Sequence, residues 1–243
     1  MKILGVCSYK GTNYYGWQKQ VGFVTVQSKI EEVLSKIYDT NVSIVGSGRT
    51  DAGVHALRQY FHFVIEKEKD LNQLLYAMNR MLPDDIRILS LDMVFDEFHA
   101  RYNAQKKVYE YDILRKAKDP FGYDTAWLYP VEFDINLLKE ALNKFVGVHN
   151  YQDFTSKEED DKNFVREIYS IAVKEEDDLV KIIFIGSGFM RYQIRNMVGT
   201  AMNVAIKKED LSFIDKHLDS QVRDIVSYKA PACGLYLAAV LYK

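Results

Sequence analysis

Arg49, Asp51 and His55 place three chemically active side chains in one short run of the sequence. Three glycines frame the run, and glycine permits backbone conformations that other residues resist. Three interpretations fit these residue types: a surface turn in which Asp51 caps a backbone N–H and pairs with Arg49, a divalent-metal site on Asp51 and His55, or a catalytic carboxylate. Further metal ligands at useful spacing are lacking, and taken alone the run is more typical of a turn.

The run is expected to be a loop at the end of a strand, because strand-like segments precede and follow it. Residues 41–45 and 59–65 are these two predicted strands. Loops held by a rigid scaffold are common places for reactive groups. The position of Asp51 is therefore compatible with catalysis without establishing it.

Helices and strands alternate along the rest of the chain. Thr25 is predicted to cap a helix whose apolar residues recur at helical spacing from Val26 to Ile37. Asp70 and Asp134 are predicted to cap two further helices. A long helix is expected over residues 192–207, and further strands are expected over residues 2–8, 86–95, 108–114, 166–174, 180–185 and 235–242.

The order of these elements predicts an α+β fold made of two similar halves. Residues 1–104 form the N-terminal half, which carries the Asp51 loop, and residues 105–243 form the C-terminal half. The loosely repeated order indicates an internal structural duplication with a cleft between the halves.

The composition is that of an ordinary globular protein, with 48% hydrophobic and 27% charged residues among 243. No apolar run reaches the roughly 18–20 residues of a membrane span, and the N-terminal apolar stretch is too short for a signal peptide. Cys7 and Cys233 are the two cysteines, far apart and without metal-type spacing. A reduced, cytoplasmic setting away from membranes is expected.

The net charge of −2 does not by itself indicate a nucleic-acid partner. The charges are unevenly spread, however. Acidic residues gather at 157–161 and 175–178, and basic residues gather elsewhere, at Arg101, Lys106, Lys107, Arg191 and Arg195. A local basic cleft is compatible with this near-neutral total.

Segments along nearly the whole chain resemble, in order, the TruA family of tRNA pseudouridine synthases. The run GRTDAGVHA at residues 48–56 is similar to the family's signature. The other similar segments lie in residues 9–27 (YKG, YYGWQKQ and TVQ), 96–101 (DEFHAR), 107–111 (KVYEY), 189–199 (FMRYQIRNMVG) and 230–237 (APACGLYL). Because the similarity is nearly end to end, the sequence is identified as a member of that family.

The resemblance implies two RRM-like or ferredoxin-like halves with a mostly antiparallel sheet and a central catalytic cleft. It also implies an isomerase that needs no cofactor and no metal. The reaction breaks the C1′–N1 bond of a uridine, turns the uracil and joins C5 to C1′ without net redox change. Asp51 would be the catalytic carboxylate of this isomerase.

The resemblance further assigns partners to Asp51. Arg195 would hold the carboxylate in its ionised form through paired hydrogen bonds. Arg49 would help to extrude the target base and fill its place in the RNA, and Tyr109 would stack on the flipped uracil. Leu235 would line the uracil pocket.

Less specific roles are expected for other residues. Phosphate contacts, which position RNA without specifying its sequence, are expected from Arg101, Lys106 and Lys107. Structural or RNA-contacting roles, rather than catalytic ones, are expected for His55 and His99. Core packing is expected of Tyr14, Tyr15 and Trp17.

Three positions depart from the family's pattern. Lys10 stands where an aspartate is common, Arg58 where a small residue is common, and Tyr192 where a histidine is frequent. None of them is the expected nucleophile. We therefore expect them to affect how this chain binds its RNA.

The expected function is isomerisation of uridine in the tRNA anticodon stem-loop, at positions 38 to 40 by family resemblance, by a homodimer that contacts one tRNA. Three alternatives stay open. The chain could be a catalytically inactive RNA-binding protein on the same scaffold, a metal-dependent hydrolase, or the same isomerase acting on another RNA site.

Overall fold

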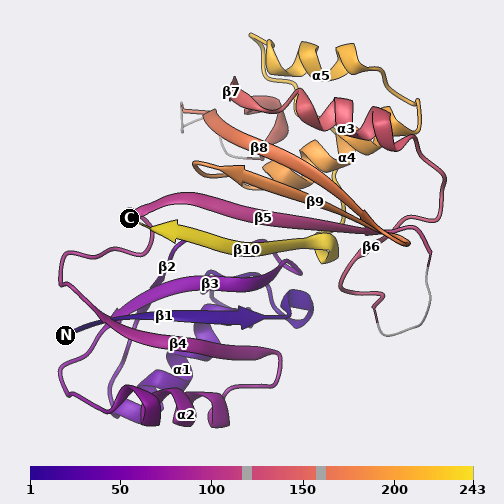
Figure 1. The fold of residues 1–243 in the computed structure, drawn as a ribbon. Helices are drawn as coiled ribbons and strands as arrows, with labels where there is room; N and C mark the ends of the chain where they lie inside the picture. Colours follow the sequence, from indigo (N-terminus) through magenta and orange to yellow (C-terminus); the bar gives the residue numbers. More distant parts are fainter. Residues whose placement is uncertain (117–121, 157–162, 243) are drawn as a thin grey trace. The chain divides into compact units, whose positions relative to one another are not determined.

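A computed structural model describes residues 1–116, 122–156 and 163–242 (Figure 1). The described residues form ten β-strands and five α-helices, and most strand pairs are antiparallel. The predicted α+β class with a mostly antiparallel sheet is therefore confirmed. The acidic residues at 157–161 lie outside the described part of the chain.

The described chain forms two compact units. Unit 1 consists of Met1–Gln105 together with the C-terminal residues from Tyr236 onward, and unit 2 is Lys106–Leu235. The last strand thus belongs mainly to unit 1. The division into α+β halves at residues 1–104 and 105–243 stays a prediction.

Unit 1 has the chain order β-α-β-β-α-β, and the last strand of the protein is added to it. Its elements are β1 (Lys2–Tyr9), α1 (Val26–Tyr38), β2 (Ile44–Gly46), β3 (His55–Val64), α2 (Leu71–Met81), β4 (Ile86–Val94) and β10 (Leu235–Tyr242). The strands are ordered β4-β1-β3, with β2 antiparallel and β10 parallel to β3. Within unit 1 this is the arrangement of a ferredoxin-like half with one extra strand.

The core of unit 1 lies between its strands and the neighbouring helices α1 and α2 (Figure 1). Ile30 and Leu34 of α1 are fully buried, as are Phe61 and, nearly so, Phe63 of β3. The two phenylalanines share one face because side chains alternate along a strand. Gly5 of β1 makes room for the Phe61 ring, since a Cβ there would lie 2.4 Å from Cζ of Phe61.

The predicted cap of α1 is present. The Thr25 side chain accepts a hydrogen bond from the Ser28 backbone N–H, and the Ser28 hydroxyl accepts one from the Thr25 N–H. This reciprocal pair satisfies two backbone donors at the start of the helix. Asp70 and Asp134 cap their helices as predicted.

The segment Asp96–Arg101 is fastened to β3 and β10. The His62 ring accepts a hydrogen bond at Nδ1 from the Ala100 N–H, and the Tyr242 hydroxyl donates to the Ala100 carbonyl at 2.7 Å. Burial, together with nearby His99 and Lys2, lowers the pKa of His62 to about 4. His62 is therefore a neutral acceptor at physiological pH.

Unit 2 contains the remaining strands and helices. They are β5 (Ala104–Leu114), β6 (Trp127–Leu128), α3 (Ile135–Asn143), β7 (Gly147–Asn150), β8 (Val165–Glu176), β9 (Leu179–Gly186), α4 (Gln193–Ala205) and α5 (Leu211–Leu218). The strands are ordered β5-β9-β8-β7, all antiparallel, and β6 runs parallel beside β5. Helix α3 packs against α4, β8 and α5 (Figure 1).

Three elements of unit 2 were not predicted: β6, β7 and α5. The two strands have two and four residues, too few for a periodic pattern. Helix α5 had a usable signal, because Asp210 caps its first turn and Ile214 and Leu218 are buried on one face. No described helix of either unit has both the length and the apolar character needed to cross a membrane.

We expect Thr25→Val to destabilise the protein by about 0.5–2 kcal/mol, because valine keeps the shape of the side chain and removes the capping oxygen. Urea unfolding of the variant and wild type measures this change. Thr25→Ser, which retains the capping oxygen, should lose less stability than Thr25→Val. Equal stability of the valine and serine variants would show that the cap contributes nothing.

His62 should make folding weaken in acid. Its pKa of about 4 lies below the usual value near 6.5, so between these values the unfolded chain takes up a proton that the folded chain does not. The free energy of unfolding should therefore fall as pH drops from about 6.5 to about 4. In His62→Asn, whose amide oxygen can replace Nδ1 and does not titrate, denaturation measured across this range should have a shallower pH dependence. An unchanged slope would contradict the assignment.

Candidate functional site

Asp51 lies in the loop between β2 and β3, as predicted. The loop ends in a tight turn in which the Val54 N–H donates to the Asp51 carbonyl at 3.1 Å. Gly53 has a φ of 78°, a conformation that other residues adopt at a cost. The Asp51 side chain is half-buried at this turn, which leaves the carboxylate within reach of a substrate.

The loop is held by the N-terminal segment that also resembles the family. The Trp17 N–H donates to the Thr50 carbonyl, and the Gly53 N–H to the Tyr14 carbonyl. The Tyr9 hydroxyl and the Thr50 hydroxyl are 2.8 Å apart. These bonds fix the backbone on both sides of Asp51.

Two glycines allow this close approach. A Cβ on Gly11 would lie 1.9 Å from the Val54 carbonyl oxygen, and one on Gly16 would lie 2.4 Å from the Thr50 carbonyl oxygen. Gly16 also has a φ of 81°. Neither position can therefore carry a larger residue without moving the Asp51 loop.

Helix α1 fixes the strand that enters the loop. The Gln27 amide donates to the Ile44 carbonyl, and the Ile44 N–H donates to the carboxylate of Glu31, both at 3.0 Å. Lys19 forms a 2.9 Å ion pair with the same carboxylate, which is buried. Gln27 lies in a segment that resembles the family, whereas Glu31 was missed, because a glutamate within an amphipathic helix gives no signal that it is buried.

Arg49 and His55 have separate contacts. Arg49 is exposed, and its Nε donates to the Gln18 side chain at 3.2 Å. His55 is buried, accepts the Gly11 N–H at Nδ1 and stacks on Tyr236 at 4.7 Å between ring centroids. These contacts hold the His55 ring between Gly11 and Tyr236, and its expected structural or RNA-contacting role stays a prediction. No group of three or more potential metal ligands occurs within the described ranges, so an Asp51–His55 metal site lacks a ligand set there.

Tyr109 lies on β5 of unit 2, and its ring packs edge-on against Phe189, with 5.2 Å between centroids. Phe189 begins the predicted segment 189–199. The Tyr109 side chain is largely buried. Unit 2 therefore brings the segments 107–111 and 189–199 together around this ring.

Arg195 lies in the first turn of α4 and is oriented by two neighbours. Its Nε donates to the Ala230 carbonyl at 2.8 Å, and the Ala230 N–H donates back to the Arg195 carbonyl. Its guanidinium lies 5.3 Å from the centre of the Tyr192 ring. Arg191 and Lys229 lie over the same ring at 4.8 and 4.4 Å, so Tyr192 gathers three cations.

The segment before Leu235 is packed against β5. The Tyr111 hydroxyl donates to the Pro231 carbonyl at 2.8 Å. A Cβ on Gly234 would lie 2.8 Å from both the Asp112 carbonyl and the Tyr111 ring. Burial raises the pKa of Tyr111, Cys233 adds to the rise, and the positive charge of Arg195 opposes it. Leu235 is buried at the start of β10.

The predicted site residues thus fall into two groups. Asp51 and Arg49 belong to unit 1, and Tyr109, Arg195 and Leu235 belong to unit 2. Each group is positioned by segments that resemble the family. The pairing of Asp51 with Arg195 and Tyr109 stays a prediction.

One predicted role is wrong. Tyr14 and Trp17 are buried as expected, but Tyr15 is 51% exposed. The Tyr14 backbone is extended, and successive side chains in an extended chain point to opposite sides. The hydrophobic character of the three aromatic residues could not distinguish them.

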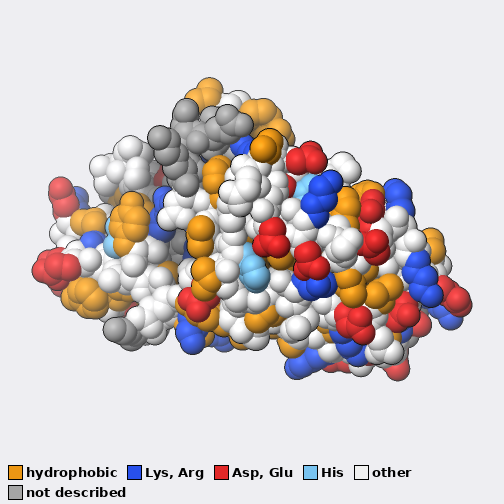
Figure 2. Space-filling model, turned by 90° about the horizontal axis from the view of Figure 1, so that it is seen from above, with side chains coloured by type: hydrophobic (Ala, Val, Ile, Leu, Met, Phe, Trp, Pro, Cys, Tyr) orange, Lys and Arg blue, Asp and Glu red, His pale blue; other side chains and the backbone are white. Residues whose placement is uncertain are grey.

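The candidate phosphate contacts lie on the surface. Arg101 and Lys106 are exposed, and each lies over a tyrosine ring, Tyr102 at 5.8 Å and Tyr169 at 5.0 Å. Lys107 is half-buried. On the face seen in Figure 2, the described acidic and basic side chains are mixed, without a broad area of one sign. Contacts of these three cations with RNA stay predictions.

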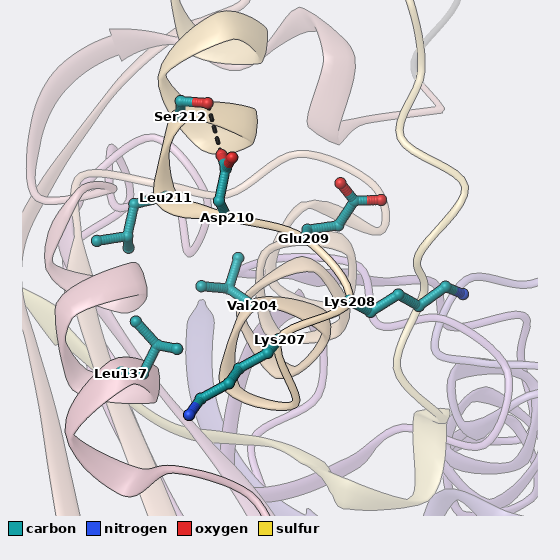
Figure 3. A pocket seen from close by; sticks show the side chains of 8 residues that line it. All are labelled: Leu137, Val204, Lys207, Lys208, Glu209, Asp210, Leu211 and Ser212. Atoms are coloured by element: carbon teal, nitrogen blue, oxygen red, sulfur yellow. Dashed lines mark hydrogen bonds between the residues drawn. The ribbon is translucent and has the colours of Figure 1, made fainter.

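A surface depression lies between α3 and the α4–α5 turn of unit 2 (Figure 3). Its acidic side chains already have partners. Asp210 accepts hydrogen bonds from Ser212 and from the Phe213 N–H, and Glu209 accepts one from Tyr228. The bond to Ser212 is the main cause of the lowered pKa of Asp210. This arrangement caps a helix and is not a candidate active site.

The chain matches a family model described as tRNA pseudouridine synthase over residues 6–103 and 141–243. The tRNA pseudouridine synthase A of Mycoplasmoides gallisepticum is 38% identical over 236 residues, which cover 97% of this chain and 89% of that protein. The protein of the same name from Streptococcus mutans is 37% identical over 246 residues, covering 100% of this chain and 99% of the relative. These similarities confirm the resemblance found in the separate segments. The chain belongs to the family of tRNA pseudouridine synthases.

Proposed function

We propose that this chain isomerises uridine to pseudouridine in tRNA, at positions 38 to 40 of the anticodon stem-loop, with Asp51 as the catalytic carboxylate. Membership of the family supports the reaction and the substrate. The observation that carries the choice of residue is the bracing of the Asp51 loop by Tyr9, Gly11 and Trp17. A half-buried carboxylate on a loop fixed at both sides is suited to catalysis, because a reacting group must be held in position.

The carboxylate would act in its ionised form. It could attack C1′ of the ribose, attack C6 of the uracil, or assist a glycal route, and all three need the same charged group in the same place. Arg195 would supply the counter-ion in this proposal. Its guanidinium is already oriented by Ala230 and Tyr192, so little reorganisation would be needed.

The remaining groups would handle the base. Tyr109 would stack on the flipped uracil, Leu235 would line its pocket, and Arg49 would occupy the space that the base leaves. The exposure of Arg49 and the braced ring of Tyr109 are compatible with these roles. Arg101, Lys106 and Lys107 would contact phosphates.

The working form in this proposal is a cytoplasmic homodimer. Both cysteines are free thiols, which suits a reducing compartment. Two copies could present two local basic clefts to one tRNA, which would help a chain whose net charge is −2.

We expect Asp51→Asn to lower tritium release from tRNA labelled at C5 of uridine by at least about 100-fold, because the amide cannot act as the charged group. Tritium leaves C5 when that carbon joins the ribose, so its release measures the reaction directly. Asp92→Asn, an exposed aspartate on β4, is the matched control and should react like wild type. Equal release from the Asp51 and Asp92 variants would refute the assignment.

The same assay separates the alternatives. A metal-dependent hydrolase would lose activity in a chelator, whereas the proposed isomerase should not. Wild-type protein that binds tRNA without releasing tritium would be an RNA-binding protein instead. Mapping of the modified positions on total RNA tests the anticodon stem-loop assignment.

Gly16→Ala should lower kcat for tRNA, because the added methyl group must push the Thr50 carbonyl away and so shift Asp51. The substitution should also lower the free energy of unfolding by more than the roughly 1–2 kcal/mol expected for the positive φ alone. Gly22→Ala is the control for the unfolding measurement, since Gly22 has nearly the same φ, 82°, with open space around it. If both alanine variants unfold alike and Gly16→Ala keeps its kcat, the loop does not depend on this contact.

A further inference from the structure

An exposed pair of aromatic rings lies beside the Asp51 loop. Tyr15 and Phe23 are 51% and 49% exposed, and their rings stack with 4.1 Å between centroids and 20° between planes. Exposed aromatic rings usually fold back onto apolar surface, because contact with water is unfavourable. Two stacked rings that both remain open to solvent instead form a flat surface on which a third ring can stack.

The rings are positioned by a tight turn, defined here as the aromatic turn, residues 15–24. The Tyr15 N–H donates to the Val24 carbonyl at 2.8 Å, and the Phe23 N–H donates to the Gln20 carbonyl. Gly22 supplies the positive φ that the turn requires. The pair is therefore held in place by backbone bonds before any partner arrives.

The aromatic turn and the Asp51 loop line one depression. Its volume is about 360 Å³, and its lining includes Tyr15, Phe23, and Ala52 and Gly53 from the turn that follows Asp51. That volume is in the range of small-ligand pockets, roughly 300–1,000 Å³. A group held there would contact Ala52 and Gly53, which directly follow Asp51 in the chain.

The chemistry of the lining favours a nucleobase. No acidic side chain is among the described residues that line the depression, and the lining is made mainly of aromatic, small and neutral polar residues. Thr12 and Asn13 add polar groups to the lining, and such groups suit the polar rim of a base. When one base is flipped out of an RNA loop, its neighbours lose stacking partners, and aromatic side chains can replace them.

We propose that Tyr15 and Phe23 form a stacking site for an unpaired base of the RNA substrate, next to the uridine that is isomerised. The proposal rests on the function proposed above. This stacking site belongs to unit 1 alone, and residues 15–24 contain none of the predicted site residues.

The test is tRNA binding by Phe23 variants, measured by filter binding of an unmodified tRNA transcript at several salt concentrations. Phe23→Ala should weaken binding by roughly 5- to 100-fold, as expected for the loss of one stacked base. Phe23→Leu, which keeps apolar bulk without an aromatic face, should weaken it similarly, and Phe23→Trp should retain it. The slope of affinity against salt should stay that of wild type, because no phosphate contact is lost.

Tyr76→Ala is the matched control, since Tyr76 is an exposed aromatic residue of the same unit, on α2, and should bind tRNA like wild type. Thermal melting of each variant checks that folding is intact. Wild-type affinity in Phe23→Leu would overturn the proposal in favour of simple apolar contact. A change in sedimentation with unchanged tRNA affinity would overturn it in favour of an interface between copies of the chain.

The failure of this inference differs from the failure of the proposed function. If wild-type protein releases tritium and the Phe23 variants bind tRNA and release tritium as wild type does, the stacking site is refuted and the proposed isomerase is not. If tRNA binding depends on Phe23 but wild-type protein releases no tritium, the proposed isomerase is refuted and the stacking site is not.

Discussion

At Gly11 and Gly16 the backbone of the N-terminal segment lies directly against the backbone of the loop that carries Asp51, with no side chain between them. Such contact is unusual for a surface loop, where chains commonly vary and move. Here the loop has little freedom, because hydrogen bonds to the Thr50 carbonyl and from the Gly53 N–H fix both sides of Asp51. The position of the carboxylate is thus determined by residues about 40 positions earlier in the chain.

Helix α1 extends this constraint to the strand that precedes the loop. The buried carboxylate of Glu31 would be costly without partners, and it has three: Lys19, Gln27 and the Ile44 N–H. Lys19 follows the segment that braces the loop, and Ile44 begins the strand that leads into it. The Glu31 carboxylate therefore connects the strand that leads into the loop with the N-terminal segment that holds the loop. The cap at Thr25 fixes the residue at which the helix that carries Glu31 begins.

Local patterns of the sequence were sufficient for the parts of the fold that depend on local physics. Helix α1 and its cap follow from Thr25 and a regular apolar face. Strands β1, β4 and β9 follow from short segments rich in apolar residues. The Asp51 loop was predicted from the strand-like segments on either side of it. Its catalytic role and both groups of site residues were assigned through resemblance, because glycine, aspartate and arginine in a turn are ambiguous by themselves. The exposure of Tyr15 and the burial of Glu31 could not be predicted, since both depend on which segments meet in space.

The departure at Tyr192 bears on how a chain with a net charge of −2 can hold a polyanion. The Tyr192 ring lies beneath Arg191, Arg195 and Lys229, and an aromatic face attracts cations without carrying a charge of its own. A histidine in this place would be repelled whenever it was protonated, so it would have to stay neutral among three cations. Tyrosine avoids this conflict. It lets three positive charges gather at one point of unit 2, and the proposed counter-ion Arg195 is among them, already oriented by the Ala230 carbonyl. A slightly acidic protein can in this way concentrate positive charge locally, where a phosphate or a carboxylate needs it, without a basic surface elsewhere.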